Sequence, residues 1–241
     1  MKKTLPFFVT VLFFLCSIYV SVNAQNNYHY QYEVVKMDSI YDRSAELTME
    51  NYLYYLKQEK DKVMNITIGS SKEAMSSYPP ESPLSDLLVN MLFEWGNEYL
   101  LSKKMQKADL ALLNFGGIRA ALPQGRITIG DIYEIIPFDN TVTFVFVKGS
   151  ELLKMFNTFN EKTAPLANVE TVYEANRLIS YTIGGAPLDL DKTYTLVTIN
   201  FLATGGDGFL SNVNFESAIY LDKLLRDVFI ETIRRTELLN Y

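Results

Sequence analysis

The spacing of apolar residues divides the chain into interleaved helices and strands. Apolar positions three or four residues apart predict helices, and short β-branched or continuous apolar runs predict strands. The predicted helices are 44–64, 83–95, 149–156 and 217–236, with a short one that begins at Thr128 and ends before Pro137. The predicted strands are 65–70, 108–113, 141–147, 178–183 and 193–199. Because strands and helices do not alternate strictly, the pattern predicts an α+β (mixed α/β) fold.

Two helix starts carry capping signals. Ser82 precedes Pro83, which is typical of an N-cap followed by proline at the first helical position. Thr128 and Asp131 stand three residues apart, as in a capping box. Between residues 70 and 82 the chain is polar and is expected to form a loop. The last helix is expected to bury one apolar face, made of Leu221, Leu224, Leu225, Val228, Phe229 and Ile233. In the first helix one face is shared by Met49, Leu53, Leu56 and Val63.

The first 24 residues have the pattern of a secretory signal peptide. Lys2 and Lys3 precede an apolar run over 5–20, and small residues at 22–24 fit a cleavage site. A membrane anchor is the rival reading, but the run is short for a span. A lipoprotein site at Cys16 is disfavoured by the large residues before it. We therefore expect export to the periplasm or the exterior, with no membrane segment after cleavage.

Cleavage would leave residues 25–241, which is the length of one domain. The single cysteine lies in the signal, so no disulfide braces the rest of the chain. The remaining chain has 28 acidic and 20 basic residues, which gives a net charge of −8. This charge argues against a nucleic-acid polymer as partner, because such binding requires basic surface.

His29 is the single histidine of the sequence. A metal centre built from imidazoles needs several of them, and no cysteine remains after cleavage to replace them. We therefore expect this chain to hold neither a metal nor another cofactor, and to contribute no catalytic residue.

Three glycine- or aromatic-marked stretches differ from the rest of the chain: NFGGIRAALPQG (114–125), IIPFDN (135–140) and INFLATGGDGF (199–209). Each lies where a strand or helix gives way to a turn, which is a common place for binding residues. Taken singly, each stretch could serve only to form a turn or to fill the core, and short motifs give many false positives for binding sites. Together they offer a guanidinium, two aromatic faces, two amides and a carboxylate. These belong to Arg119, Phe138, Phe201, Asn114, Asn140 and Asp207.

This set of side chains suits a nucleoside or nucleotide. Aromatic faces stack on a base, which is worth about 1–3 kcal/mol per base. A carboxylate accepts hydrogen bonds from a ribose diol, and a guanidinium suits a phosphate or a ring nitrogen. Glycines would allow the sharp turns and the close approach of the backbone to the ligand. The turn glycines are Gly116, Gly117, Gly205, Gly206 and Gly208.

These motifs make the sequence resemble the C-terminal, substrate-binding domain of the 5′-nucleotidase family, which includes UDP-sugar hydrolases and 2′,3′-cyclic phosphodiesterases. NFGGIR matches the family's Asn-Gly-Gly-Gly-Ile-Arg, PFDN its Pro-Phe-Gly-Asn, and NFLATGGDGF its Asn-Phe-Leu-Ala-Thr/Asn-Gly-Gly-Asp-Gly-Phe/Tyr. The resemblance covers essentially residues 25–241. It implies a four-layer α/β/β/α domain.

The resemblance also implies a role for each site residue. Phe138 and Phe201 would stack on either side of the base, and Asn140 would contact the base edge. Asp207 would hold the ribose hydroxyls. On the ribose and phosphate side the ligand would meet Asn114 and Arg119.

In that family, catalysis belongs to a separate metallophosphoesterase domain with two metal ions. The resemblance therefore implies that this chain is the specificity domain of a split 5′-nucleotidase, inactive alone, with divalent metals in a separately encoded partner chain. The alternative is an exported nucleoside-binding module without activity, and a third possibility is a degenerate interaction domain. The sequence departs from the family pattern at three places near the site. YPPES (78–82) contains no basic residue, residues 159–172 contain no glycine, and Phe115 stands in place of a glycine.

Overall fold

The computed structural model describes residues 33–34, 47–174, 177–236 and 238–239. The chain forms two units, Met1–Tyr52 and Leu53–Tyr241. The predicted signal peptide and His29 lie outside the described residues, and every described strand belongs to the second unit. Across the described ranges, no helix combines the length and the apolar character that a membrane crossing needs.

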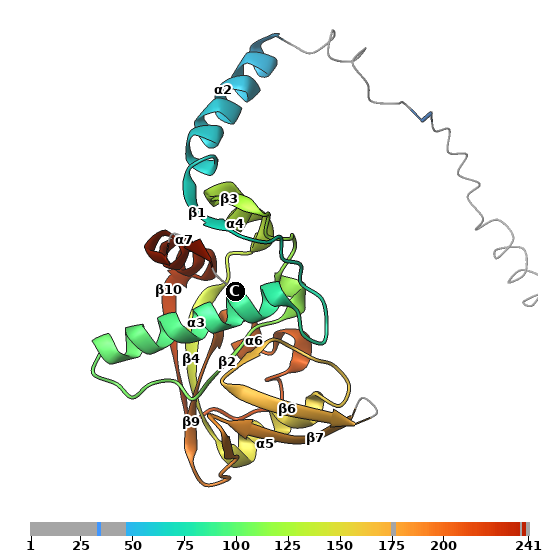
Figure 1. The fold of residues 1–241 in the computed structure, drawn as a ribbon, viewed down its shortest axis with the longest axis vertical. Helices are drawn as coiled ribbons and strands as arrows, with labels where there is room; N and C mark the ends of the chain where they lie inside the picture. Colours follow the sequence, from blue (N-terminus) through green and yellow to red (C-terminus); the bar gives the residue numbers. More distant parts are fainter. Residues whose placement is uncertain (1–32, 35–46, 175–176, 237, 240–241) are drawn as a thin grey trace, which may run out of the picture. The chain divides into compact units, whose positions relative to one another are not determined.

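A five-stranded mixed sheet forms the centre of the second unit (Figure 1). Its strands, in spatial order, are β10 (Ser217–Leu224), β4 (Thr141–Lys148), β9 (Thr193–Ile199), β2 (Leu110–Leu112) and β5 (Leu166–Ala167). β2 and β9 are parallel, and the other neighbours are antiparallel. Both β4 and β9 are buried along most of their length rather than at alternate positions, because both faces of the sheet are covered.

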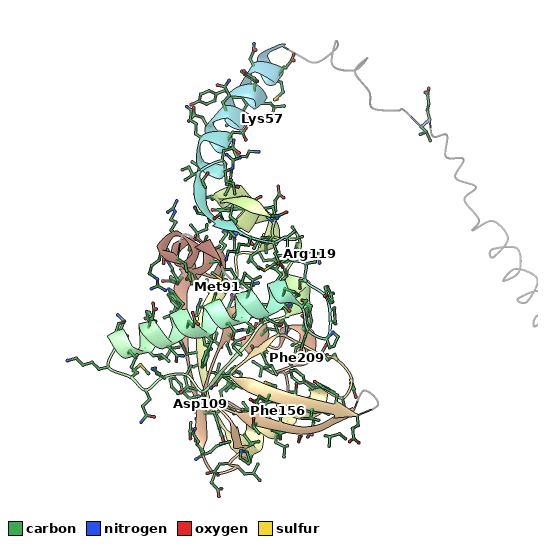
Figure 2. The ribbon with its side chains drawn as sticks, in the orientation of Figure 1. Lys57, Met91, Asp109, Arg119, Phe156 and Phe209 are labelled. Carbon is green, nitrogen blue, oxygen red and sulfur yellow. The ribbon has the colours of Figure 1, made fainter. Side chains whose placement is uncertain are left out.

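Helices supply much of that cover. α3 (Pro83–Ser102) contacts β2, β5 and β9, and it crosses the sheet in Figure 1. α5 (Gly149–Thr158) contacts β4, and α7 (Leu225–Thr236) contacts α3 and β10. Met91 of α3 and Phe156 of α5, both labelled in Figure 2, belong to the buried core.

Two smaller sheets complete the described fold. One consists of β11 (Leu238–Leu239), β1 (Thr67–Ser71) and β3 (Gly125–Thr128). The other consists of β6 (Val169–Glu174), β7 (Arg177–Ile183) and β8 (Ala186–Pro187). The remaining short elements are α4 (Ile129–Ile135), α6 (Asn200–Ala203) and the 3-10 turns η2 (Phe115–Gly117) and η3 (Gly206–Gly208). This mixture of helices and sheets confirms the predicted α+β class.

The prediction of one helix over 217–236 is wrong for its first eight residues. Residues 217–224 form β10, which pairs antiparallel with β4, and the helix α7 begins at Leu225. Leu221 and Leu224 lie on the strand and are partly buried, whereas Val228 and Phe229 lie on the helix and are fully buried. Apolar residues on both sides of the junction mimic a single helical face.

The two capping signals differ in outcome. At α4, Thr128 and Asp131 form the predicted capping box, with the Asp131 backbone N–H donating to Thr128 Oγ1 at 3.2 Å. At α3, Ser82 occupies the N-cap position, but its side chain does not cap the helix. Its hydroxyl lies 2.7 Å from Ser85 Oγ and accepts from the Tyr78 backbone N–H at 3.0 Å.

The predicted first helix is α2 (Leu47–Met64). The residues predicted to share a face lie on it, and all four side chains are exposed: Met49, Leu53, Leu56 and Val63. Tyr52, Tyr54 and Tyr55 are exposed as well. Helical periodicity therefore predicted the helix correctly, although it did not indicate whether the apolar face is covered.

Candidate functional site

The topology of the central sheet brings the three marked stretches to one edge. Asn114 follows the carboxyl end of β2, and the INFLATGGDGF stretch follows the carboxyl end of the parallel strand β9. β4 is antiparallel to β9, with Val142 opposite Ile199. The PFDN turn, which precedes β4, therefore lies at the same edge as the other two stretches.

A pocket of about 160 Å³ forms where the three stretches meet. It is lined by Asn114, Gly116, Gly117, Phe138, Asn140 and Phe201. Each stretch thus contributes at least one predicted site residue. Phe138 and Phe201 are 46% and 41% exposed, which is unusual for large aromatic side chains that converge on one pocket.

Asp207 does not line this pocket, but it is bonded to a residue that does. Asn114 Nδ2 donates to Asp207 Oδ2 at 2.7 Å across 93 residues of sequence. Asn114 is itself buried, and this bond connects the first and third stretches beside the pocket. The second carboxylate oxygen of Asp207 accepts no hydrogen bond among the described residues.

The glycines of the third stretch have distinct physical roles. A Cβ on Gly206 would lie 2.5 Å from the ring of Phe201, so the ring packs directly on this backbone. Gly205 and Gly208 have φ angles of 98° and 72°, which favour glycine. Between them Asp207 adopts a φ of 53°, which a short polar side chain tolerates better than most residues.

The glycines of the first stretch also differ from each other. A Cβ on Gly117 would lie 2.8 Å from Asn114 Oδ1, so a larger residue here would displace the Asn114 side chain. A Cβ on Gly116 would meet Asn114 Nδ2 at 3.5 Å, which is ordinary contact. Gly116 therefore has no steric requirement within the chain itself.

Arg119 is not brought into the pocket. Its side chain is exposed, and Nη1 reaches the Gly116 carbonyl at 3.5 Å, the outer limit for a hydrogen bond. Its backbone N–H donates to the Ile135 carbonyl at 2.8 Å, which ties the residue to the end of α4. Figure 2 labels Arg119 above the sheet, between η2 and β3 in the chain.

Sequence reasoning missed two side chains that hydrogen-bond to the main chain of these stretches or of a residue next to them. Asn200 Oδ1 accepts from the backbone N–H of Thr141 at 3.0 Å, which links the third stretch to the end of the PFDN turn. Lys162 Nζ donates to the carbonyl of Asp207 and lies 4.6 Å from the ring centroid of Phe209. Asn200 lies inside a quoted motif, so its position was a usable signal, whereas Lys162 carried none.

A larger cavity of about 460 Å³ lies elsewhere on the unit, between the start of α3 and β6. It is lined by Glu81, Asp86, Asn90, Tyr173 and eight further residues, none of them basic. Burial, followed by the charge of Glu81, raises the pKa of the Tyr173 hydroxyl. This cavity contains none of the predicted site residues, and the smaller pocket remains the candidate site.

Within the described part of the chain, no cluster of three or more histidine, cysteine, aspartate or glutamate side chains could hold a metal ion. The candidate site can therefore offer stacking surfaces, amides and one carboxylate from its own residues. Groups of these kinds are suited to binding and orienting a ligand.

Comparison with known proteins places the chain in a family. The model of the family described as 5′-nucleotidase, C-terminal domain, matches residues 64–212. The chain is 38% identical over 118 residues to the protein UshA of Yersinia enterocolitica, covering 46% of this chain and 22% of that protein. It is 35% identical over 109 residues to a 5′-nucleotidase of Vibrio cholerae, covering 43% and 20%. The chain thus spans about a fifth of the length of these relatives.

Solved structures agree on the fold. A 5′-nucleotidase precursor from Thermus thermophilus superposes with a TM-score of 0.67 at 23% identity, covering 79% of this chain and 41% of that one. The NAD nucleotidase of Haemophilus influenzae superposes with a TM-score of 0.59 at 20% identity, covering 80% and 40%. Since the family model matches more than half of the sequence, the chain belongs to the family of 5′-nucleotidase C-terminal domains.

Proposed function

We propose that this chain is the nucleoside- or nucleotide-binding specificity domain of a split, exported 5′-nucleotidase. The observation that supports this most is the convergence of three sequence stretches on one pocket. Phe138 and Phe201 line it from two of them, and both rings remain substantially exposed. Burying such rings against a ligand would recover stacking and hydrophobic free energy that the free protein lacks.

Each remaining side chain has a matching ligand group in this proposal. A base would stack between the two rings, with the Asn140 amide at its edge. The unbonded carboxylate oxygen of Asp207 would accept from a ribose hydroxyl, while Asn114 holds the other oxygen. Arg119, exposed outside the pocket, would meet a phosphate that projects from the ribose.

Hydrolysis of the phosphoric ester would fall to another polypeptide, a metallophosphoesterase that carries the divalent metals. The sequence supports this division, because it holds one histidine and one cysteine in all. The signal-like first 24 residues support export, so the partner would be exported too.

Reconstitution tests the proposal. The purified chain is mixed with a candidate exported metallophosphoesterase in the presence of Mn²⁺, and phosphate release from AMP, GMP, CMP and UMP is measured. We expect no release from this chain alone and release on mixing that Phe201→Ala abolishes. Tyr220→Ala, which removes an exposed aromatic on β10 outside the three stretches, is the control and should leave the rate unchanged. Release that does not depend on this chain would contradict the proposal.

One observation favours a second function, a stand-alone nucleoside-binding module. Two aromatic rings and two amide side chains of this chain line the pocket, so the chain itself supplies the groups proposed to hold a nucleoside. Tight nucleoside binding, combined with no reconstituted hydrolysis from any exported metallophosphoesterase, would favour this module over the split enzyme.

A further inference from the structure

Arg226, at the start of α7, is a buried cation that sequence reasoning did not single out. The residue is 9% exposed, and burial of a charge is costly unless hydrogen bonds and counter-charges compensate. The groups that contact the guanidinium therefore identify the part of the fold that it stabilises.

Those contacts all lie on α4 and the turn that follows it. Nη1 donates to the carbonyls of Pro137 and Phe138 at 3.3 and 3.4 Å, and Nη2 donates to the carboxylate of Asp139. The guanidinium carbon lies 4.6 Å from the ring centroid of Tyr133. Nε is buried without a hydrogen-bond partner among the described residues. All hydrogen bonds that the guanidinium makes among these residues therefore go to the turn.

The neighbouring backbone adds a further bond to the same turn. The N–H of Leu225 donates to the Asn140 carbonyl at 2.9 Å. The start of α7 therefore contacts the main chain of Pro137, Phe138 and Asn140. Phe138 and Asn140 both line the candidate pocket.

We propose that Arg226 is a positioning residue that fixes the Pro137–Asn140 turn and, through it, the ring of Phe138. The ring is 46% exposed, so little packing of its own holds it in place. Its position depends on the backbone of the turn, and the guanidinium donates to two carbonyls of that backbone. The part of the inference that concerns ligand affinity rests on the proposed nucleoside site.

The hydrogen bonds to the two carbonyls, rather than the ion pair with Asp139, fix the turn. The Asp139 side chain is 79% exposed, and exposed ion pairs contribute little to stability. Arginine can serve two carbonyls and a carboxylate at once because its planar fork has five donors, whereas lysine cannot reproduce that geometry. Asp139→Ala should therefore loosen the turn less than Arg226→Met, with Arg226→Lys between them.

Hydrogen exchange in the ligand-free chain tests the positioning directly. The amides of Leu225 and Thr141 are both hydrogen-bonded at the carboxyl end of this turn, the first to the Asn140 carbonyl and the second to Asn200 Oδ1. In Arg226→Met we expect both to exchange at least tenfold faster, while amides in the middle of β4, such as that of Val145, keep their rates. Arg234→Met removes an exposed arginine from the same helix and should change none of these rates.

Unchanged exchange at Leu225 and Thr141 would overturn the proposal, and so would equal acceleration throughout β4, which would indicate a merely structural residue. If Arg226→Met does not fold, Arg226→Lys serves instead, with a smaller acceleration at the same two amides.

Calorimetric titration with adenosine, guanosine, cytidine and uridine tests the consequence for binding. We expect Arg226→Met to weaken binding at least tenfold in the wild-type background and less than threefold in the Phe138→Ala background, because it acts through that ring. Equal losses in both backgrounds would contradict this. If the wild type binds no nucleoside, the proposed function fails, while the exchange result still decides the positioning role.

Discussion

At the scale of single residues, the contact between Gly206 and Phe201 gives the sharpest prediction. A Cβ at position 206 would lie 2.5–2.6 Å from three atoms of the Phe201 ring, so Gly206→Ala must displace the ring. We expect nucleoside affinity to fall at least tenfold, which corresponds to about 1.4 kcal/mol. Calorimetry measures the affinity, and thermal unfolding shows whether the variant remains folded. Unaltered affinity in a folded variant would show that the ring position does not matter for binding.

Asp207 gives a prediction about the sugar. Its free carboxylate oxygen is expected to accept from a ribose hydroxyl, and charged hydrogen bonds contribute about 1.5–3 kcal/mol. The wild type should therefore bind a ribonucleoside at least tenfold more tightly than the matching 2′,3′-dideoxynucleoside. In Asp207→Asn this preference should shrink while weak binding of the dideoxynucleoside persists. A preference that survives the substitution would assign the ribose contact to another residue.

The grouping of the candidate site residues was largely predictable from sequence, because the three motifs carry side chains of matching chemistry, whereas their role in binding stays a prediction. Phe138, Phe201 and Asn140 line one pocket as a set, as their chemistry suggested. Lys162 and Arg226 were not predictable, since both act by donating to main-chain carbonyls of distant turns. Such contacts leave no pattern in a single sequence.

At the scale of elements, the capping box of α4 supports the turn that carries Phe138. Asp131 Oδ2 accepts from both the backbone N–H and the hydroxyl of Thr128 at 2.7 Å. Thr128→Ala should lower the free energy of unfolding by about 1 kcal/mol, as is typical for loss of an N-cap. Urea denaturation measures this loss. Thr128→Ser keeps the hydroxyl and should retain most of the stability, and equal losses in both variants would argue against the cap.

The packing of β7 on α5 predicts a dependence on pH. Tyr181 stacks on Phe156 with ring centroids 3.9 Å apart, and burial, followed by the neighbouring Tyr194, raises the pKa of its hydroxyl. The stabilisation by the neutral hydroxyl is fully present below pH ~10, the usual tyrosine value, and is lost as the pH rises through the raised pKa of the folded state.

Tyr181→Phe keeps the stacked ring but removes this titration. Above pH ~10 the wild type should therefore lose free energy of unfolding more steeply than the variant. Urea denaturation at pH 8 and pH 10.5 measures the difference. Parallel losses in the two proteins would show that Tyr181 titrates alike in the folded and unfolded states.

Most elements were predictable because their periodicity is unambiguous, and the exceptions have physical causes. Residues 217–224 were assigned to a helix because apolar residues continue across the start of α7, and pairing with β4 decides the matter in the fold. Short strands such as β5 and β8 are too brief to show a period. Hydrogen bonds to the strands beside them define these short strands, so the local sequence pattern cannot predict them.

For the molecule as a whole, the proposed function assigns binding and chemistry to different polypeptides. The second unit builds a pocket at one edge of its central sheet from three separate stretches of the chain. The proposed hydrolysis needs metals that we assign to another polypeptide. Nucleoside binding by this chain alone is therefore the central claim, and the split enzyme is a consequence that depends on it.

Isothermal titration of the purified chain with adenosine, guanosine, cytidine and uridine tests this claim most directly. We predict saturable binding of at least one nucleoside, weakened at least tenfold by Phe138→Ala and by Phe201→Ala but not by Tyr220→Ala. Absence of binding for all four nucleosides and their 5′-monophosphates, in a wild-type chain shown to be folded, would contradict the account.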